Sequence, residues 1–237
     1  MRMIGSSGLV SAYRHSYRAT GQPSPTKILS CTGLSISSFS DYFKYPCRFI
    51  HDAECAAMTD LWQNPDLENS VYLSIGKHLG STVIIGGDFH TGDSGKSGII
   101  EHMILVPGGR PCYCGKKGCV ESYCSLTALL EGRDTLDGFF MQKRAGSPEY
   151  EKRFHEFLDH LADAVHNVRM VIDIPVILGG PLSPYLEPQD FDYLASSVKS
   201  QEILPLSDKQ IRQGSKLPHM ISVGAALPYV REFLASI

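Results

Sequence analysis

The sequence predicts an α/β fold with a mixed sheet, and three features support this expectation. Residues 71–77 and 81–89 (VYLSIGK and STVIIGGDF) have the composition of two consecutive strands, and Gly86-Gly87-Asp88 indicates a tight hairpin turn after the second. Residues 175–180 (PVILGG) predict a short buried strand. Helical patterns lie around these strands, and such alternation is typical of α/β proteins.

The N-terminal part of the chain precedes these strands. The first fifty residues are rich in turn formers and predict little regular structure before a short apolar strand at residues 47–50. Residues 53–62 (AECAAMTDLW) contain strong helix formers, so we expect a helix that starts just after that strand.

Three further helices are expected towards the C terminus. Residues 121–132 predict a helix that ends near Gly132. A long helix is expected to begin at Ser147-Pro148, because proline suits a first helical turn and apolar residues then recur on one face. Residues 222–233 predict a terminal helix that is interrupted at Pro228. The apolar face of the long helix consists of Tyr150, Phe154, Phe157, Leu158, Leu161, Val165 and Val168.

The bulk composition excludes several classes of protein. A formal net charge of -3 and scattered basic residues give no electrostatic basis for nucleic-acid binding by this chain. The longest apolar runs, such as residues 103–106, are too short to cross a bilayer, so no membrane partner is expected. Residues 1–15 lack the apolar core of a secretory signal. The seven cysteines are therefore expected to be reduced thiols in the cytoplasm.

Three of the cysteines are concentrated in the segment CYCGKKGC, residues 112–119. Their spacing places three soft ligands within reach of one ion, and Gly115 and Gly118 allow the chain to fold back between them. Tetrahedral zinc takes a fourth ligand, and His102 lies at a suitable spacing upstream. The predicted metal ligands are therefore His102, Cys112, Cys114 and Cys119.

A closed set of three cysteines and one histidine leaves no open coordination position, so the zinc would be structural rather than catalytic. The alternative is a group of buried thiols that bind no metal. The other cysteines stand apart from this cluster and are interpreted as small core residues. They are Cys31, Cys47, Cys55 and Cys124.

The order of these features resembles the ROK family (repressors, open reading frames and sugar kinases). Its signature, a histidine followed by C-x-C-G-x-x-G-C-x-E, matches His102 and residues 112–121. Weaker matches run in the correct order from about Gly33 to the C terminus, through HDAECAA, SIGKHLG, GDFHTGDSGKSGIIEHM, VILGG and SVGAAL. The resemblance implies an actin-like ATPase (ribonuclease H-like) fold, in which two α/β lobes bind a sugar in the cleft between them.

The resemblance also implies roles for individual residues. Asp52 stands where the family's kinases keep the base that deprotonates the sugar hydroxyl, although taken alone it predicts a helix N-cap. His102 would bind both zinc and sugar, and Glu121 would accept hydrogen bonds from sugar hydroxyls. Taken alone, Glu121 is a first-turn residue stabilised by the helix dipole. The positions that match nucleotide-binding loops are Gly76, Gly80, Gly179 and Gly180.

The start of the chain departs from the family pattern. ROK kinases begin with an Asp-containing, Gly-rich phosphate hairpin that residues 1–15 do not contain, so we expect an incomplete first lobe. The expected domains are a remnant of the N-terminal lobe at 1–52 and a C-terminal lobe at 53–222, which includes the cysteine loop (residues 98–122). Residues 223–237 would form a terminal helix that returns to the first lobe.

Two ligand-binding loops of the family also differ here. The phosphate loop G-T-G-x-G is replaced by Gly76-Lys77-His78-Leu79-Gly80, and a side chain at the middle glycine obstructs a close approach to phosphate. The motif G-E-x-G-H is replaced by residues 98–102, with Ile99 in place of a sugar-binding glutamate. Loss of such a charge-assisted hydrogen bond costs roughly 1.5–3 kcal/mol. In an extended chain Glu101 would share a face with Ile99 and could replace that glutamate.

These departures, together with His51-Asp52-Ala53 in place of Asn-Asp-Ala, favour the repressor branch of the family. We expect a zinc-containing domain of a transcriptional regulator that binds a sugar or sugar phosphate and has no kinase activity. The resemblance implies a homodimer, and DNA contact would require an N-terminal module absent from this chain. The alternative is an active, glucokinase-like sugar kinase that uses ATP and magnesium. A zinc-stabilised scaffold that binds another protein is a third hypothesis.

Overall fold

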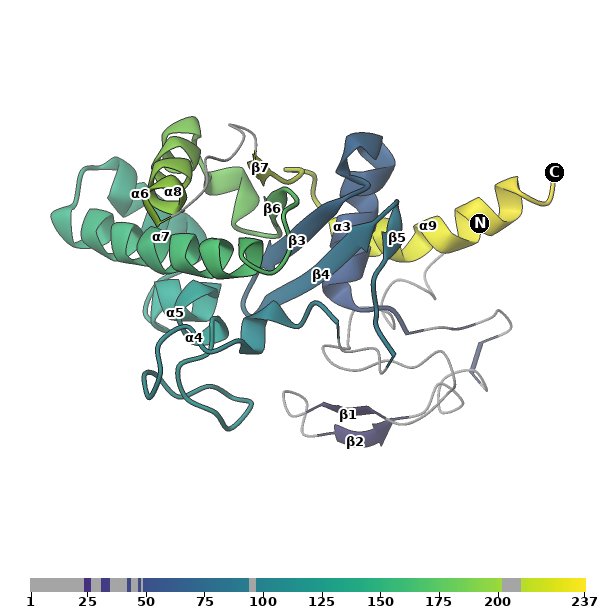
Figure 1. The fold of residues 1–237 in the computed structure, drawn as a ribbon, viewed down its shortest axis with the longest axis horizontal. Coiled ribbons are helices and arrows are strands. Elements are labelled where there is room, and N and C mark those ends of the chain that lie inside the picture. Colours follow the sequence, from purple (N-terminus) through teal and green to yellow (C-terminus); the bar gives the residue numbers. More distant parts are fainter. Residues whose placement is uncertain are drawn as a thin grey trace. The chain divides into compact units, whose positions relative to one another are not determined.

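The computed structural model describes residues 42–43, 47, 49–93, 97–201 and 210–237 of the chain (Figure 1). It also describes the backbone of two short strands, β1 (Ser24–Thr26) and β2 (Cys31–Leu34), which pair in an antiparallel ladder. The expectations that concern residues 1–15 therefore lie outside the described residues. The domain boundaries expected from the sequence stay predictions.

The chain divides into two compact units. Each unit is assembled from segments that are distant in the sequence, so the units do not correspond to two successive stretches of chain. The first unit contains Met1–Asn69, Thr82–Gly98 and Leu217–Ile237, and the second contains Ser70–Ser81 and Ile99–Lys216.

Among the described residues, the main sheet has five strands in the order β5-β4-β3-β6-β7. β3 pairs in parallel with β6, and β6 pairs in parallel with β7, whereas β4 and β5 are antiparallel. Gly86 and Gly87 connect β4 to β5 with φ values of 59° and 81°, a region that favours glycine. The predicted mixed sheet and Gly-Gly hairpin are both confirmed. The strands are Ser70–Ile75 (β3), Leu79–Ile85 (β4), Asp88–Phe89 (β5), Val176–Gly179 (β6) and Ile211–Gln213 (β7).

The described helices are unequal in length, and the long ones carry an apolar face. None combines the length and apolar character needed to cross a membrane. The α-helices are Asp52–Gln63 (α3), Glu121–Cys124 (α4), Leu126–Leu130 (α5), Leu136–Arg144 (α6), Pro148–Arg169 (α7), Pro188–Gln201 (α8) and Met220–Leu234 (α9). Short 3-10 helices occupy Pro65–Leu67 (η1), Ile100–His102 (η2) and Ser183–Tyr185 (η3).

In the first unit, α3 and α9 pack closely together. A Cβ at Gly224 would overlap the backbone carbonyl of Cys55, so only glycine permits this separation of the two helices. Thr59 Oγ1 donates a hydrogen bond to the carbonyl of Met220 at 2.7 Å. The predicted interruption of the last helix was wrong, because α9 continues through Pro228.

In the second unit, α6, α7 and α8 form a helical layer in which α7 packs against both of the others (Figure 1). The predicted apolar face of α7 is buried except at Tyr150, which is partly exposed. Phe139 and Phe140 of α6 pack against Phe154 of α7, with ring centroids 6.4 and 5.3 Å apart. Aromatic rings at these separations interact favourably in addition to the area that they bury.

Two further local predictions were wrong. The helix expected over residues 121–132 is divided at Ser125, whose hydroxyl caps α5 by accepting a hydrogen bond from the Ala128 N–H at 3.2 Å. The strand expected over residues 47–50 is absent from its described positions, and Phe49 and Ile50 lie in irregular chain that leads into α3.

Candidate functional site

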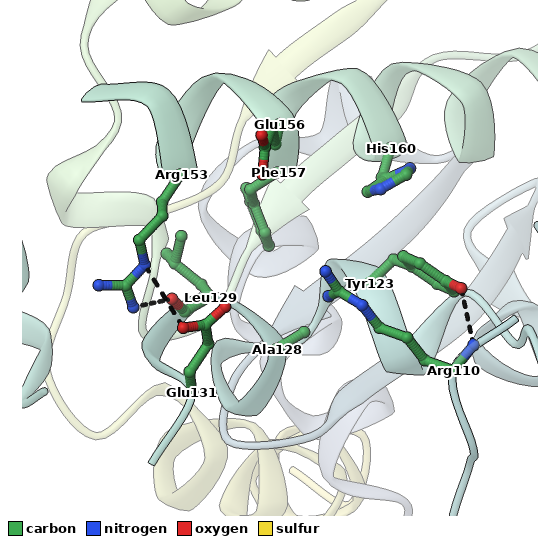
Figure 2. Close-up of a pocket in the computed structure, with 9 residues that line it drawn as sticks. All are labelled: Arg110, Tyr123, Ala128, Leu129, Glu131, Arg153, Glu156, Phe157 and His160. Carbon is green, nitrogen blue, oxygen red and sulfur yellow. Dashed lines mark hydrogen bonds and ion pairs between the residues drawn. The ribbon is translucent and has the colours of Figure 1, made fainter. Parts of the chain in front are cut away.

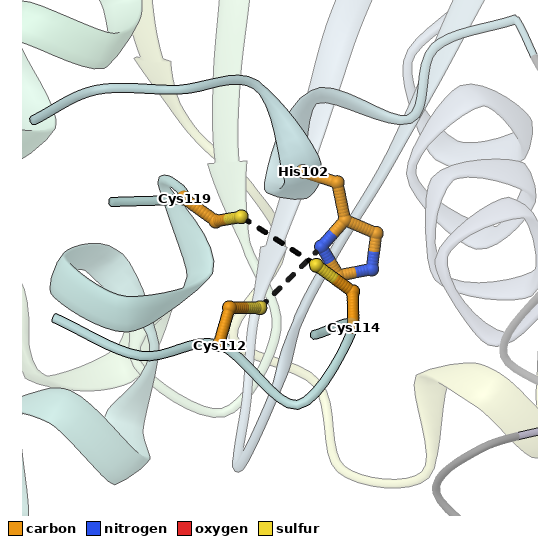
Figure 3. A group of neighbouring side chains, drawn as sticks. All are labelled: His102, Cys112, Cys114 and Cys119. Atoms are coloured by element: carbon orange, nitrogen blue, oxygen red, sulfur yellow. Dashed lines mark hydrogen bonds between the residues drawn. The ribbon is translucent and has the colours of Figure 1, made fainter. Parts of the chain in front are cut away.

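The four predicted metal ligands converge in the second unit (Figure 3). One ligand atom from each of His102, Cys112, Cys114 and Cys119 lies within 4.8 Å of the others. Cys112 Sγ is 3.7 Å from His102 Nδ1, and Cys114 Sγ is 3.6 Å from Cys119 Sγ. Sulfur ligands about 2.3 Å from one tetrahedral ion would lie about 3.8 Å apart. The arrangement therefore fits a single tetrahedral metal ion.

Backbone hydrogen bonds hold the cysteine loop in this conformation. The Cys112 N–H donates to the carbonyl of Lys116, and the Gly115 N–H donates to the carbonyl of Cys112, both at 2.9 Å. Gly118 has a φ of 82°, and a Cβ there would overlap the carbonyl of Val106. The second glycine of the signature is therefore required by the geometry of the loop.

The 3-10 helix η2 presents His102, and Ser81 of β4 anchors that helix. Ser81 Oγ accepts a hydrogen bond from the Ile100 N–H at 2.9 Å and donates to the carboxylate of Glu101. Glu101 is buried, with an exposed fraction of 1%. The idea that Glu101 replaces the glutamate lost at Ile99 assumed an extended chain, and that assumption is wrong because Glu101 lies in a helical turn.

The three thiols differ in acidity. Burial raises the pKa of Cys112, and burial together with hydrogen bonds to the other two thiols raises the pKa of Cys119 to about 12. Burial also opposes ionisation of Cys114, but hydrogen bonds from the Lys116 backbone and from the other two thiols lower its pKa overall. A coordinated divalent cation deprotonates its thiol ligands, so metal binding here would release protons and depend on pH.

Glu121, the first residue of α4, is held by one hydrogen bond from the connection between β3 and β4 and by one from the first residue of β4. Its Oε1 lies 2.7 Å from His78 Nδ1, and its Oε2 accepts from the Leu79 N–H at 2.6 Å. The Tyr113 ring stands edge-on to both His78 and His102, with a centroid distance of 5.1 Å in each case. Sequence reasoning did not identify His78 or Tyr113 as site residues.

Three of the four glycines matched to the nucleotide loops lie at the ends of β3 and β6. Gly76 directly follows β3, and Gly179 is the last residue of β6. Gly180 has a φ of 78°, and a Cβ there would lie 2.7 Å from the backbone nitrogen of Ile75, so this close approach requires glycine. Gly80 lies inside β4 rather than in the preceding loop.

Asp52 is the first residue of α3. The interpretation of Asp52 as the N-cap is wrong, because His51 occupies that position and its Nδ1 accepts from the Ala53 N–H at 3.3 Å. Asp52 Oδ1 lies 3.5 Å from His51 Nδ1 and accepts from the Ala53 N–H at 2.9 Å. A carboxylate in this first turn is stabilised by the helix dipole. Asp52 and Glu121 belong to different compact units.

A small hollow of about 20 Å³ is lined by residues of α4, α5 and α7, by Glu131 directly after α5 and by Arg110 of the cysteine loop (Figure 2). This volume accommodates about one water molecule. Arg110 lies over the Tyr123 ring at 4.8 Å, and that ring meets His160 of α7 edge-on at 4.6 Å. Burial and the charge of Arg110 lower the pKa of His160. These contacts connect the cysteine loop to α7 and include none of the predicted ligand-binding residues.

Comparison with solved structures identifies the fold. A ROK family glucokinase from Streptomyces griseus, in complex with glucose and AMPPNP, matches with a TM-score of 0.71 at 22% identity, over 81% of this chain and 70% of that chain. A ROK family transcriptional regulator, a homologue of the E. coli MLC protein, matches with a TM-score of 0.69 at 19% identity, over 81% and 53%. The expected α/β, actin-like ATPase fold is confirmed, and both kinases and regulators share it.

The family follows from the sequence. The ROK family model matches residues 3–203, and the chain belongs to the ROK family. An N-acetylmannosamine kinase from Vibrio cholerae is 31% identical over 144 residues, which cover 57% of this chain and 50% of that kinase. The match thus spans about half the length of this curated relative.

Proposed function

We propose that this chain belongs to the kinase branch of the ROK family and takes part in phosphorylating a hexose or an N-acylated amino sugar. The observation that carries the proposal is the Glu121 carboxylate, which is buried and held by His78 and Leu79. A fixed, charged acceptor of this kind suits the hydroxyls of a sugar. The resemblance to an N-acetylmannosamine kinase supports a kinase, whereas the altered loops at residues 76–80 and 98–102 favoured a regulator.

Asp52 is the proposed catalytic base. It accepts the proton of a sugar hydroxyl while that oxygen forms a bond to the γ-phosphorus of ATP, and the bond from the γ-phosphorus to the β–γ bridging oxygen breaks to release ADP. ATP supplies the phosphoryl group. Gly76, Gly80, Gly179 and Gly180 are the proposed nucleotide contacts, on the basis of the family resemblance.

We further propose that the His102, Cys112, Cys114 and Cys119 cluster holds a structural zinc ion. Three sulfur ligands and one imidazole nitrogen suit zinc, and a closed set of four leaves no position for a reacting water. The ion would fix the loop that joins His102 to Glu121, and the sugar contacts of both residues would depend on it. The homodimer expected from the family resemblance stays a prediction.

A coupled ADP-release assay tests the proposal, with Mg-ATP and either N-acetylmannosamine or glucose as the sugar. Asp52→Asn should lower kcat by about 10²–10⁴-fold, because the variant cannot accept the hydroxyl proton. Asp88→Asn, an exposed position in β5, is the matched control and should retain the activity of the parent chain. Absence of turnover with every sugar tested would contradict the kinase proposal.

A sugar-sensing domain without kinase activity is the second candidate. It is favoured by the β3–β4 connection, where Lys77 and His78 replace the hydroxyl residue and the glycine of the family's phosphate loop. Isothermal titration with hexoses, amino sugars and their 6-phosphates distinguishes the two candidates. Sugar binding without turnover would support the sensor. Absence of binding to every sugar tested would exclude both the kinase and the sensor and leave the scaffold hypothesis.

A further inference from the structure

The histidine that disrupts the family's phosphate-loop sequence makes a specific contact of its own. His78 Nδ1 lies 2.7 Å from Glu121 Oε1, and the two side chains are only 22% and 5% exposed. These residues are 43 positions apart in the sequence, so the contact depends on the tertiary fold. A glycine at position 78 would have no side chain to make it.

The neighbouring backbone strengthens this contact. The Leu79 N–H donates to Glu121 Oε2 at 2.6 Å, so each carboxylate oxygen is engaged by a different group of one short segment. Two donors on the two oxygens fix both the side-chain rotamer and the plane of the carboxylate. Hydrogen bonds to an ionised acceptor are also stronger than those between neutral groups.

The cysteine loop also contacts the histidine. The Tyr113 ring, between Cys112 and Cys114 in the sequence, meets the His78 ring at an interplanar angle of 76°. The same tyrosine meets the ring of His102 at 74°. Edge-to-face contacts of this kind restrict the orientation of the rings. His78 is therefore packed by the loop that carries the predicted metal ligands and bonded to the predicted sugar contact.

We propose that His78 is a positioning residue that holds the Glu121 carboxylate in the orientation required to receive a sugar hydroxyl. The proposal rests on the proposed function in so far as Glu121 contacts the sugar. His78 also links the β3–β4 connection to the carboxylate, and the adjacent Leu79, at the start of β4, makes the second hydrogen bond. A substitution at His78 that is designed to alter nucleotide binding would therefore also disturb the carboxylate proposed to contact the sugar.

Two substitutions at His78 separate this role from simple space filling. His78→Phe keeps an aromatic ring against Tyr113 but removes the donor, whereas His78→Asn loses the ring and keeps a nitrogen donor at the δ position. In His78→Phe we expect the Kd for N-acetylmannosamine or glucose to rise about tenfold, which equals about 1.4 kcal/mol. In His78→Asn the Kd should recover to within about threefold of the parent value. His155→Phe, at an exposed position of α7, is the matched control and should leave the Kd unchanged.

Hydrogen exchange in the sugar-free, zinc-loaded chain provides a second measurement. The Leu79 amide should exchange about tenfold faster in His78→Phe than in the parent, because a disordered Glu121 protects it less. Zinc content and the protection of α7 should stay at parent values in both variants. An unchanged exchange rate of the Leu79 amide in His78→Phe would overturn the positioning role, regardless of the measured sugar affinity. Equal losses of affinity in the Phe and Asn variants would overturn it too.

The same design distinguishes failure of this inference from failure of the proposed function. If the parent chain binds no sugar in the panel, the proposed function fails, and the exchange of the Leu79 amide still decides whether His78 holds Glu121. If the parent binds sugar and His78→Phe binds it equally well, the proposed function stands and the positioning role is wrong. For an active parent, His78→Phe should raise KM for the sugar more than it lowers kcat, because ground-state orientation is what it removes.

Discussion

The cysteine loop and the helical layer belong to the same compact unit, yet they are stabilised in different ways. Between His102 and Cys119, a stretch that the structure describes completely, the only buried apolar side chains are Cys112 and Cys119. The helical layer instead buries a continuous apolar face and a group of packed aromatic rings. Apolar burial can offset the conformational entropy of the helices. In the cysteine loop, coordination of the proposed zinc ion would make the corresponding contribution.

Removal of two metal ligands tests this difference most strongly. In a Cys114→Ser and Cys119→Ser double variant, zinc measured by elemental analysis should fall from about one equivalent per chain to near zero. Amides of the cysteine loop should lose protection from hydrogen exchange, because the free energy of metal binding would also stabilise the folded loop. The amides of α7 should stay protected. Cys47→Ser, outside the cluster, should keep its zinc. Retention of one tightly held equivalent by the double variant would contradict the ligand set.

The opposite perturbation removes an aromatic ring from the helical layer. Phe154 is 1% exposed and packs against rings of α6 and α7, so Phe154→Ala should lower the free energy of unfolding by about 3–5 kcal/mol. Urea unfolding followed by circular dichroism measures this change. The folded variant should still bind zinc, because no ligand is altered. Met141→Ala, at an exposed position of α6, is the control and should cost far less. A loss below about 1 kcal/mol in Phe154→Ala would show that the site collapses around the missing ring.

The sequence predicts both regions, from two different local patterns. The metal cluster was predictable because its three thiols lie within eight residues, and the required turns are marked by glycine. The buried face of α7 was predictable because an apolar periodicity is repeated over several turns. In both cases the signal is local, and the structure adds only the geometry.

Contacts between distant segments were not predictable in this way. The His78–Glu121 contact joins positions 43 residues apart, and nothing near His78 indicates its partner. Buried Glu101 accepts a hydrogen bond from Ser81, which lies 20 residues upstream in β4. The division of the helix at Ser125 illustrates a subtler failure, because a serine within a helical pattern is equally compatible with an exposed side chain and a cap.

The smallest expected effect concerns the place where the cysteine loop meets the helical layer. His160 of α7 contacts Tyr123. Its pKa is lowered mainly by burial and, to a smaller extent, by the charge of Arg110. Nearby carboxylates act in the opposite direction without reversing the shift, namely Glu156, Asp159 and Asp163. Since the ordinary histidine pKa is about 6.5, both folded and unfolded chains are neutral at His160 above that pH. As pH falls below it, the unfolded chain binds the proton first, so His160 contributes a loss of stability on the acidic side.

A comparison with His160→Gln isolates this contribution, because glutamine cannot titrate between pH 5 and 8. Unfolding by urea at saturating zinc should give the two chains parallel stabilities from pH 8 down to about 6.5, after which the parent loses stability faster than the variant. Acid release of zinc affects both chains alike and cancels in the difference. A difference that stays constant down to pH 5 would mean that burial and the charge of Arg110 impose no cost on protonation of His160. The cysteine loop and the helical layer would then be joined by packing alone.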